Sequence, residues 1–457
     1  MLVEHPRGVA EGATRLNRLS RLREPRVLAV IAVSAVLALL IGLQVAAWIS
    51  GFDGPLASLA RDYVGTPKSM SVPWAGLVLA LVGVSARRRV IAAGAAIGID
   101  AVWAALRLLD GQPFAVGNGP TIVLTALVLI AVLRWRGRER TDALRAAALG
   151  ALLVLATKVG DVWLHVTSAV HPTVLDEYLL LADHALGDPA WVMGRVLDVL
   201  GPEVYAVLHW VYIELPVAAI VVAVWQLRRV VPTGIWPSHY LVRTFLVLGL
   251  VGPLFYVLFP VVGPMFAFGP DGHGFQVGDF WPTALPPLDH SPAALSFDEV
   301  TPRNCMPSMH TAWALSLFLH TRRDIDGSRA PAWLRWGGAF WLIATVAATL
   351  GFGYHYGVDL VAGAILCLTV ESALRSPERG WGAFRIRLVA FGTVTFAGLL
   401  LSYRYLAVPM AEYPITAGAI VLGLLAAVSI AFHTTWFATA PIPTAKTGVT
   451  PEPATTA

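Results

Sequence analysis

The sequence is poor in charged residues and has only two cysteines, Cys305 and Cys367. Charged side chains make up 14% of its 457 residues, and the formal net charge is +4. We expect no disulfide, because Cys305 is predicted near the membrane surface and Cys367 about 18 Å deeper along a helix. The small positive charge does not indicate a nucleic-acid partner, since the arginines cluster beside apolar runs. The low cysteine count excludes a disulfide-stabilised scaffold, and the small net charge gives no support to a nucleic-acid binder.

Apolar residues make up 56% of the chain, and the mean hydropathy is +0.67. Runs of nearly 20 apolar residues recur, which is typical of a polytopic membrane protein. The run 27–49 is apolar on every face, which excludes the alternation of a β-barrel strand, and it exceeds the apolar core of a signal peptide, about 7–15 residues. We therefore predict an all-α polytopic membrane protein with about twelve transmembrane helices. Their centres are expected near residues 38, 78, 98, 126, 151, 213, 251, 313, 343, 366, 395 and 424.

Arginine clusters predict the orientation of these helices. Each cluster falls at the N-terminus or on an even-numbered loop: residues 7–26, 87–89, 134–145, 228–229, 322–335 and 375–387. The positive-inside rule then places both termini in the cytoplasm and the odd-numbered loops outside. Two outer loops are long, about 158–197 and 263–306, and such loops often cover a binding site. The Ala, Arg, Gly and Val bias suggests a bacterial inner membrane.

We predict five regions along the chain. They are a basic N-terminus (1–26), a four-helix membrane region (27–149), a catalytic core with the outer loop 263–306 (150–375), two further membrane helices (376–437) and a disordered tail (438–457).

The stretch PRNCMPSMHTAW, residues 302–313, is predicted to open the eighth membrane helix from the outer side. Pro307 suits a first helical turn, because its missing N–H would have no helical partner. The free N–H groups of that turn can bind an anion, and the Ser308 hydroxyl and the Arg303 guanidinium can add donors.

A second polar stretch, GFGYHYGVDLVAG, places His355 and Asp359 four residues apart at the outer start of the tenth helix. That spacing puts both side chains on one helix face, on the same side of the membrane as His310. This set suits phosphoryl transfer through a phosphohistidine. His355 would be the nucleophile, Asp359 would orient it and His310 would be the general acid and base, so no metal and no cofactor is required.

These residues resemble a known family. Pro307-Ser308-Met309-His310 and His355-x-x-x-Asp359 are similar to two signature motifs of the type-2 phosphatidic acid phosphatase superfamily, membrane-embedded phosphatases and phosphotransferases with a six-helix core. The resemblance covers residues 150–375, and its sequence context is closest to the inositol phosphorylceramide synthase branch. It implies the same three catalytic residues. It also implies a lipid phosphate or phospholipid substrate and contact with membrane lipids, and it leaves the oligomeric state open.

The chain departs from that family in its phosphate-binding residues. The superfamily's first motif has no match, since Arg243 is predicted at the cytoplasmic end of its helix. Ala348 and Thr349 replace a Ser-Arg pair. We therefore expect Arg303, Lys158 and Arg195, together with Ser308, to bind the phosphate.

Other polar residues leave alternatives open. Lys158 could instead form an ion pair with Asp161, and His209 and Glu214 within a predicted span are either functional or core residues. A glycosyltransferase using a polyprenyl-phosphate sugar, with Asp53 and Asp62, is the alternative enzyme. A lipid carrier is the alternative without catalysis.

Overall fold

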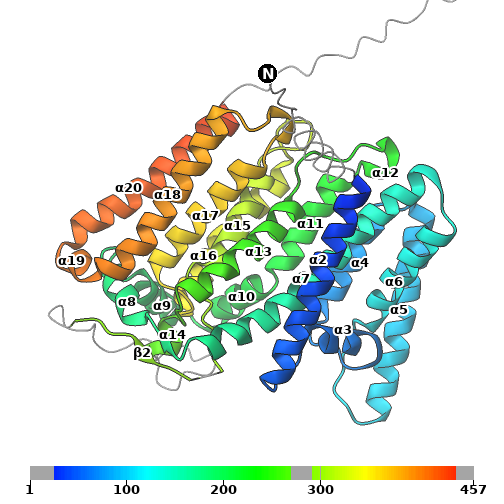
Figure 1. Cartoon of the computed structure of the whole chain (residues 1–457), viewed down its shortest axis with the longest axis horizontal. Helices are drawn as coiled ribbons and strands as arrows, with labels where there is room; N and C mark the ends of the chain where they lie inside the picture. The colour runs from blue at the N-terminus through cyan, green and yellow to red at the C-terminus, as the bar shows by residue number, and fades with distance from the viewer. Residues whose placement is uncertain (1–24, 269–290, 299, 439–457) are drawn as a thin grey trace, which may run out of the picture. The chain divides into compact units, whose positions relative to one another are not determined.

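A computed structural model describes residues 25–268, 291–298 and 300–438 (Figure 1). The predicted N-terminal region and tail lie outside these residues except for their edges, as does much of the predicted outer loop. Seven of the described helices are long and apolar enough to cross a membrane: 86–109, 137–170, 215–233, 241–258, 357–374, 383–405 and 414–437. The prediction of an all-α polytopic membrane protein is confirmed. The chain forms helices because lipid offers no hydrogen-bond partners, so the backbone N–H and C=O groups must bond to each other.

The chain divides into two compact units, Met1–Val166 and Thr167–Ala457. The division falls within α7. Unit 1 contains α2 (Pro25–Ile49), α3 (Pro55–Val64), α4 (Ser71–Leu81), α5 (Ala86–Leu109), α6 (Asn118–Leu133) and most of α7 (Gly137–Val170).

Small residues allow the helices of unit 1 to pack closely. A Cβ atom on Gly150 of α7 would lie 2.0 Å from the carbonyl oxygen of Gly76 in α4, and one on Gly119 of α6 would lie 2.0 Å from the carbonyl oxygen of Ala96 in α5. Only glycine fits at such crossings, which are common between membrane helices.

Unit 2 contains the remaining elements. They are β1 (Thr173–Val174), α8 (Asp176–His184), α9 (Pro189–Leu200), α10 (Pro202–Ile213), α11 (Leu215–Leu227), α12 (Val230–Thr233), α13 (Leu241–Leu258), α14 (Pro264–Phe268), β2 (Leu295–Ser296), α15 (Met309–His320), α16 (Ala332–Gly351), α17 (Gly357–Leu374), η1 (Pro377–Arg379), α18 (Ala383–Tyr405), α19 (Ala407–Glu412), α20 (Pro414–His433) and η2 (Thr434–Ala438). The strands β1 and β2 form an antiparallel pair.

The sixth predicted span is broken into two helices, α10 and α11. The break falls at Glu214, two residues before Pro216. Proline supplies no N–H for an i→i−4 bond and disfavours helical geometry in the residue before it, so the apolar run continues but the helix does not.

Helix α17 is the interior helix of unit 2. Its membrane-length window is 83% buried, against 17–44% for the other six candidate spans. It packs against α13, α15, α18 and α20. Figure 1 shows α17 between α15 and α18, with α8, α9 and α14 at the end of unit 2 where α17 begins. The fold therefore holds the N-terminal end of α17, which carries Asp359, inside the protein.

Candidate functional site

The residues of the candidate site lie at the N-terminal ends of α15 and α17. Ser308 is the N-cap of α15, where its hydroxyl oxygen accepts a hydrogen bond from the Thr311 N–H at 3.3 Å. Its own N–H donates to the carbonyl oxygen of Asp359 at 3.2 Å, which ties the start of α15 to α17. The prediction that Pro307 occupies the first turn is wrong, because the Ser308 cap starts the helix at Met309.

His355 and Asp359 are adjacent, with 3.4 Å between His355 Nδ1 and Asp359 Oδ2. The reason is not a shared helix face, as the spacing predicted, because α17 begins only at Gly357. Asp359 is instead the third residue of α17, and its Oδ2 accepts the Tyr356 N–H at 2.8 Å in a capping box. That cap turns the preceding residue, His355, back toward the carboxylate.

Cys305 lies within this pair. Its Sγ donates to Asp359 Oδ2 at 2.6 Å and lies 3.4 Å from His355 Nδ1. The residues Cys305, His355 and Asp359 are all buried, with exposed fractions of 1%, 4% and 0%. Burial raises the pKa of the Cys305 thiol well above its usual range, with a further contribution from the Asp359 carboxylate, so the group is a neutral thiol at pH 7. From the sequence, Cys305 was considered only as a disulfide partner, so this contact was not predicted.

His310 completes the cluster. Its half-buried ring stacks on Tyr212 at a centroid distance of 3.9 Å, and it interacts electrostatically with His355. Burial lowers the pKa of His355 to about 4, which leaves its imidazole neutral at pH 7 and able to act as a nucleophile. The structure thus brings the three predicted catalytic residues together.

Two buried carboxylates support the segment that carries His355. Asp176 accepts the Tyr356 hydroxyl at 2.9 Å and the Gly263 N–H at 2.9 Å, and Asp183 accepts the Val358 N–H at 3.0 Å. Sequence reasoning missed both residues. Their spacing of seven, which places them on one face of a helix, was an available signal.

Arg303 has a structural role, because it bonds to the backbone of neighbouring segments. It is fully buried, and its guanidinium donates to the carbonyl oxygens of His171 at 2.8 and 3.1 Å, of Asp298 at 2.6 Å and of Thr301. These contacts join His171, the residue after the end of α7, to the segment before α15. Its predicted role in phosphate binding stays a prediction.

The other two predicted phosphate-binding residues each pair with a carboxylate. Arg195 pairs with Asp198 on α9 at 3.3 Å and is half exposed. Lys158 belongs to unit 1, where its buried Nζ lies 2.9 Å from Asp62 Oδ1. The alternative ion pair between Lys158 and Asp161 is wrong, because Asp161 pairs with Lys68 at 2.6 Å.

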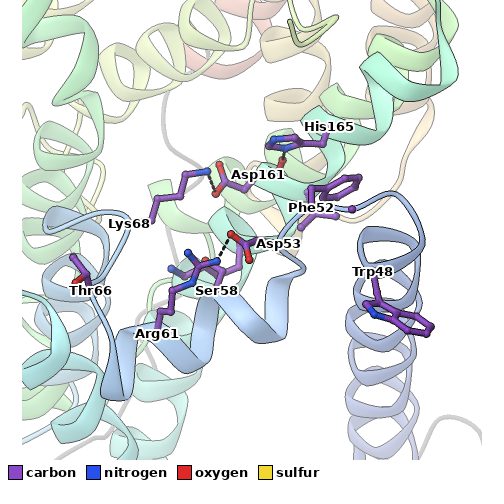
Figure 2. Close-up of a pocket in the computed structure, with 12 residues that line it drawn as sticks. Trp48, Phe52, Asp53, Ser58, Arg61, Thr66, Lys68, Asp161 and His165 are labelled. Atoms are coloured by element: carbon purple, nitrogen blue, oxygen red, sulfur yellow. Dashed lines mark hydrogen bonds and ion pairs between the residues drawn. The ribbon is translucent and has the colours of Figure 1, made fainter. Parts of the chain in front are cut away.

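Unit 1 has a polar pocket of its own, with a volume of about 680 Å³, that includes Lys158. In Figure 2 the side chains of Arg61 and Asp53 point toward each other, as do those of Lys68 and Asp161. The cations that line this pocket therefore each have a carboxylate partner. Asp53 and Asp62, on which the glycosyltransferase alternative depends, are both ion-paired.

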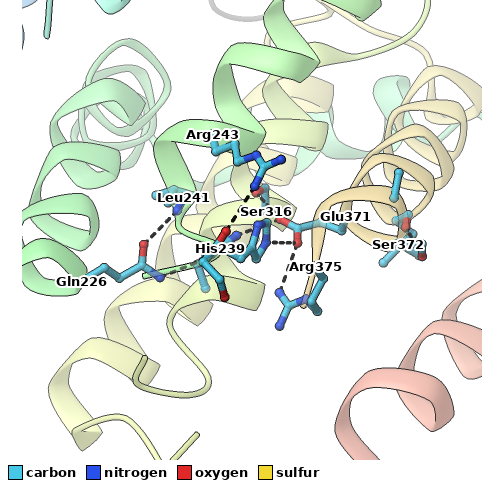
Figure 3. Close-up of polar contacts among 12 residues, drawn as sticks. Gln226, His239, Leu241, Arg243, Ser316, Glu371, Ser372 and Arg375 are labelled. Carbon is cyan, nitrogen blue, oxygen red and sulfur yellow. Dashed lines mark hydrogen bonds and ion pairs between the residues drawn. The ribbon is translucent and has the colours of Figure 1, made fainter. Parts of the chain in front are cut away.

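A second polar cluster lies at the opposite ends of α15 and α17 (Figure 3). The fully buried Glu371 carboxylate accepts hydrogen bonds from Ser316 at 2.9 Å and Arg375 at 3.2 Å. It also contacts His320 Nε2 at 2.9 Å and His239 Nε2 at 3.0 Å. Twelve residues separate Asp359 from Glu371, so the two clusters are about 18 Å apart along α17.

The sequence left the roles of His209 and Glu214 open. The His209 ring packs on Tyr205 and Phe352, with centroid distances of 6.3 and 6.1 Å. Glu214 occupies the break between α10 and α11. These positions favour the core interpretation of His209.

Comparison with known families gives two matches. Residues 177–372 match the model of the PAP2 superfamily, and residues 27–166 match that of a domain of unknown function (DUF5933). No curated protein and no solved structure matches the chain. The first match spans α8 to α17 and includes His310, His355 and Asp359. It supports a phosphatase-type enzyme acting on lipid phosphates in a membrane.

Proposed function

We propose, with the PAP2 superfamily match as premise, that this protein transfers the phosphoryl group or phosphorylated headgroup of a membrane lipid through a phosphohistidine at His355. The observation that carries the proposal is the meeting of His310, His355 and Asp359 at the N-terminal ends of α15 and α17. Two imidazoles and an orienting carboxylate are the groups that such a transfer needs.

In the first step His355 Nε2 attacks phosphorus while Asp359 accepts the hydrogen bond of Nδ1–H. The new N–P bond replaces the P–O bond to the leaving group, and His310 gives that oxygen its proton. In the second step His310 takes a proton from water or an alcohol, whose oxygen attacks phosphorus and releases His355. The negative charge on the equatorial oxygens would be stabilised by the free N–H groups at the start of α15.

The surroundings of His310 favour a lipid substrate. Tyr212 stacks on its ring, and Trp313 meets it edge-on at 6.1 Å. Tyr354 lies 5.2 Å from Tyr212 between ring centroids. An aromatic wall with hydroxyl groups suits a substrate that is apolar at one end and polar at the other.

The acceptor of the phosphoryl group decides which reaction results. Water as acceptor gives a phosphatase, and a lipid alcohol gives a transferase like the inositol phosphorylceramide synthases. The distribution of arginines supports an N-in, C-in protein of a bacterial inner membrane with the site on the extracytoplasmic side.

The test uses purified protein in detergent with EDTA and a panel of phosphatidic acid, polyprenyl phosphate, and phosphatidylinositol with a lipid alcohol. Free phosphate and new phospholipids are measured by mass spectrometry, and acid-labile phosphoprotein is trapped with a radiolabelled substrate. We expect wild type and His433→Ala, which alters an exposed histidine on α20, to react and His355→Ala to lose activity and label. Unchanged activity in His355→Ala would contradict the proposal, and activity only without EDTA would contradict metal independence.

A further inference from the structure

We propose that Cys305, His355 and Asp359 form a binding site for a thiophilic divalent cation such as zinc, and that its occupation switches the catalytic centre off. The inhibitory part rests on the proposed function, whereas cation binding does not. The cation would bind at Nδ1 of His355, on the side of the ring away from the phosphorus that Nε2 attacks.

The three donor atoms are already close to the geometry of such a site. Cys305 Sγ lies 3.4 Å from His355 Nδ1 and 2.6 Å from Asp359 Oδ2, and Nδ1 lies 3.4 Å from Oδ2. Tetrahedral zinc, with bonds of about 2.3 Å to sulfur and 2.0–2.1 Å to nitrogen and oxygen, sets its donors about 3.3–3.6 Å apart. Two of the three separations already fit. The third must open by about 0.9 Å, as expected when a cation replaces a hydrogen bond.

The donor set also balances the charge of the cation. Thiolate, imidazole and carboxylate are the three kinds of side chain that bind zinc in proteins. Binding releases the Cys305 proton to solvent, so the two positive charges of the cation meet one thiolate and one carboxylate. The resulting neutral complex suits a buried position, where an uncompensated charge is costly.

One ligand atom in the site has no other partner. Asp359 Oδ1 is buried and accepts no hydrogen bond from any residue that the structure describes. A buried carboxylate oxygen without a donor carries a desolvation cost that a cation would remove. Oδ1 can thus join or replace Oδ2 as a ligand, which leaves Oδ2 with the Tyr356 N–H.

Occupation of the site would block catalysis by changing the tautomer of His355. A neutral imidazole that binds a cation through Nδ1 carries its single proton on Nε2. The proton that Nδ1 donated to Asp359 is therefore on Nε2 in the cation complex. Nε2 then has no lone pair to attack phosphorus, so cation binding and phosphohistidine formation exclude each other.

A second cluster, His239, His320 and Glu371, also contains residues of the types that bind cations, but its hydrogen bonds do not suit a cation. The Leu241 N–H donates to Gln226 Oε1 at 2.8 Å, which turns the Gln226 amide nitrogen toward His320 Nδ1 at 3.0 Å. His320 Nδ1 must accept, so its Nε2 carries the proton and donates to Glu371. To bind a cation beside Glu371, His320 Nε2 would have to be unprotonated, with the proton on Nδ1. Arg375 already supplies positive charge to the Glu371 carboxylate (Figure 3).

The experiment begins with binding, using Cd²⁺ as the probe because cadmium thiolates absorb in the ultraviolet. Purified full-length wild type, Cys305→Ala and the control Cys367→Ala are titrated in detergent, with folding checked by thermal unfolding. We expect one Cd²⁺ per chain and a thiolate band in wild type and Cys367→Ala, and no band in Cys305→Ala. A band that depends on Cys367, or no band in wild type, would overturn the site. Should Cys305→Ala fail to fold, Asp359→Asn is expected to weaken Cd²⁺ binding at least ten-fold.

The second part measures activity with Zn²⁺. We expect Zn²⁺ to inhibit wild type and Cys367→Ala reversibly, with EDTA restoring activity. The residual activity of Cys305→Ala should require at least ten-fold more Zn²⁺ for half-inhibition. Cd²⁺ binding without inhibition by either cation would overturn the switch. Cd²⁺ binding in a protein inactive on every lipid phosphate would overturn the proposed function but leave the cation site standing.

Discussion

The carbonyl oxygen of Ser308 lies 2.3 Å from the point that a Cβ atom on Gly363 would occupy. This contact brings the segment before α15 against the side of α17, one turn after Asp359. No side chain fits between them, so the separation of these two segments depends on the absence of one methyl group.

We expect Gly363→Ala to lower the free energy of unfolding by about 1–3 kcal/mol, the usual cost of inserting a methyl group into a packed core. Activity should fall further than stability, because the backbone that must move carries Ser308 and is next to His310. The matched control is Gly398→Ala in α18, where no atom lies within 4 Å of the added methyl group. Thermal unfolding and turnover of both variants check the prediction, and similar behaviour of the two would contradict it.

His310→Ala should lower kcat/KM by about 10²–10⁴ for lipid phosphates with an alkyl leaving group. The loss should be much smaller for an aryl phosphate such as p-nitrophenyl phosphate, because that leaving group departs without a proton. The measurement compares kcat/KM for both substrates in wild type and variant. Equal losses for the two substrates would contradict the role of His310 as general acid.

Arg303→Lys should act on stability more than on substrate binding. A lysine cannot donate to the carbonyl oxygens of His171, Asp298 and Thr301 together, and each buried oxygen left without a donor costs about 1–3 kcal/mol. We expect a clear fall in the unfolding midpoint, whereas Arg195→Lys, with one exposed ion pair, should change it little. If KM rises in Arg303→Lys while the unfolding midpoint stays constant, Arg303 binds phosphate, as the sequence alone suggested.

The Asp176 carboxyl should make stability depend on pH. Burial raises its pKa from 3.8 to about 6. A group whose pKa is higher in the folded state stabilises the fold fully below its unfolded value, and this contribution is lost as pH rises through the folded value. Wild type should therefore lose about 2 kcal/mol between pH 4 and 6 relative to Asp176→Asn, which has no such proton. Unfolding midpoints at half-unit pH steps measure the difference, and parallel curves for the two proteins would count against it.

Much of the site followed from local sequence. The capping segment around Ser308 and the order His355-x-x-x-Asp359 are short patterns. Each consists of residues close together in the chain, so it can be recognised from the sequence alone. The contacts of Cys305 could not be predicted in this way, although it lies only two residues before Pro307, because its partners are 50 and 54 residues away in the chain. Lys158 is a similar case, since nearby Asp161 suggested an ion pair and its partner is Asp62, 96 residues away.

The sequence by itself determined that this is a helical membrane protein, because a chain in lipid must bond its own backbone and runs of nearly 20 apolar residues are long enough to span a bilayer. It also supplied the prediction that His310, His355 and Asp359 transfer a phosphoryl group. Only the tertiary structure decided that a thiol lies within the His355–Asp359 pair, that Asp176 and Asp183 hold the segment around them, and that Arg303 bonds to carbonyl oxygens. These contacts depend on how closely helices distant in the chain approach each other, which glycines such as Gly363 control through packing rather than through any local pattern.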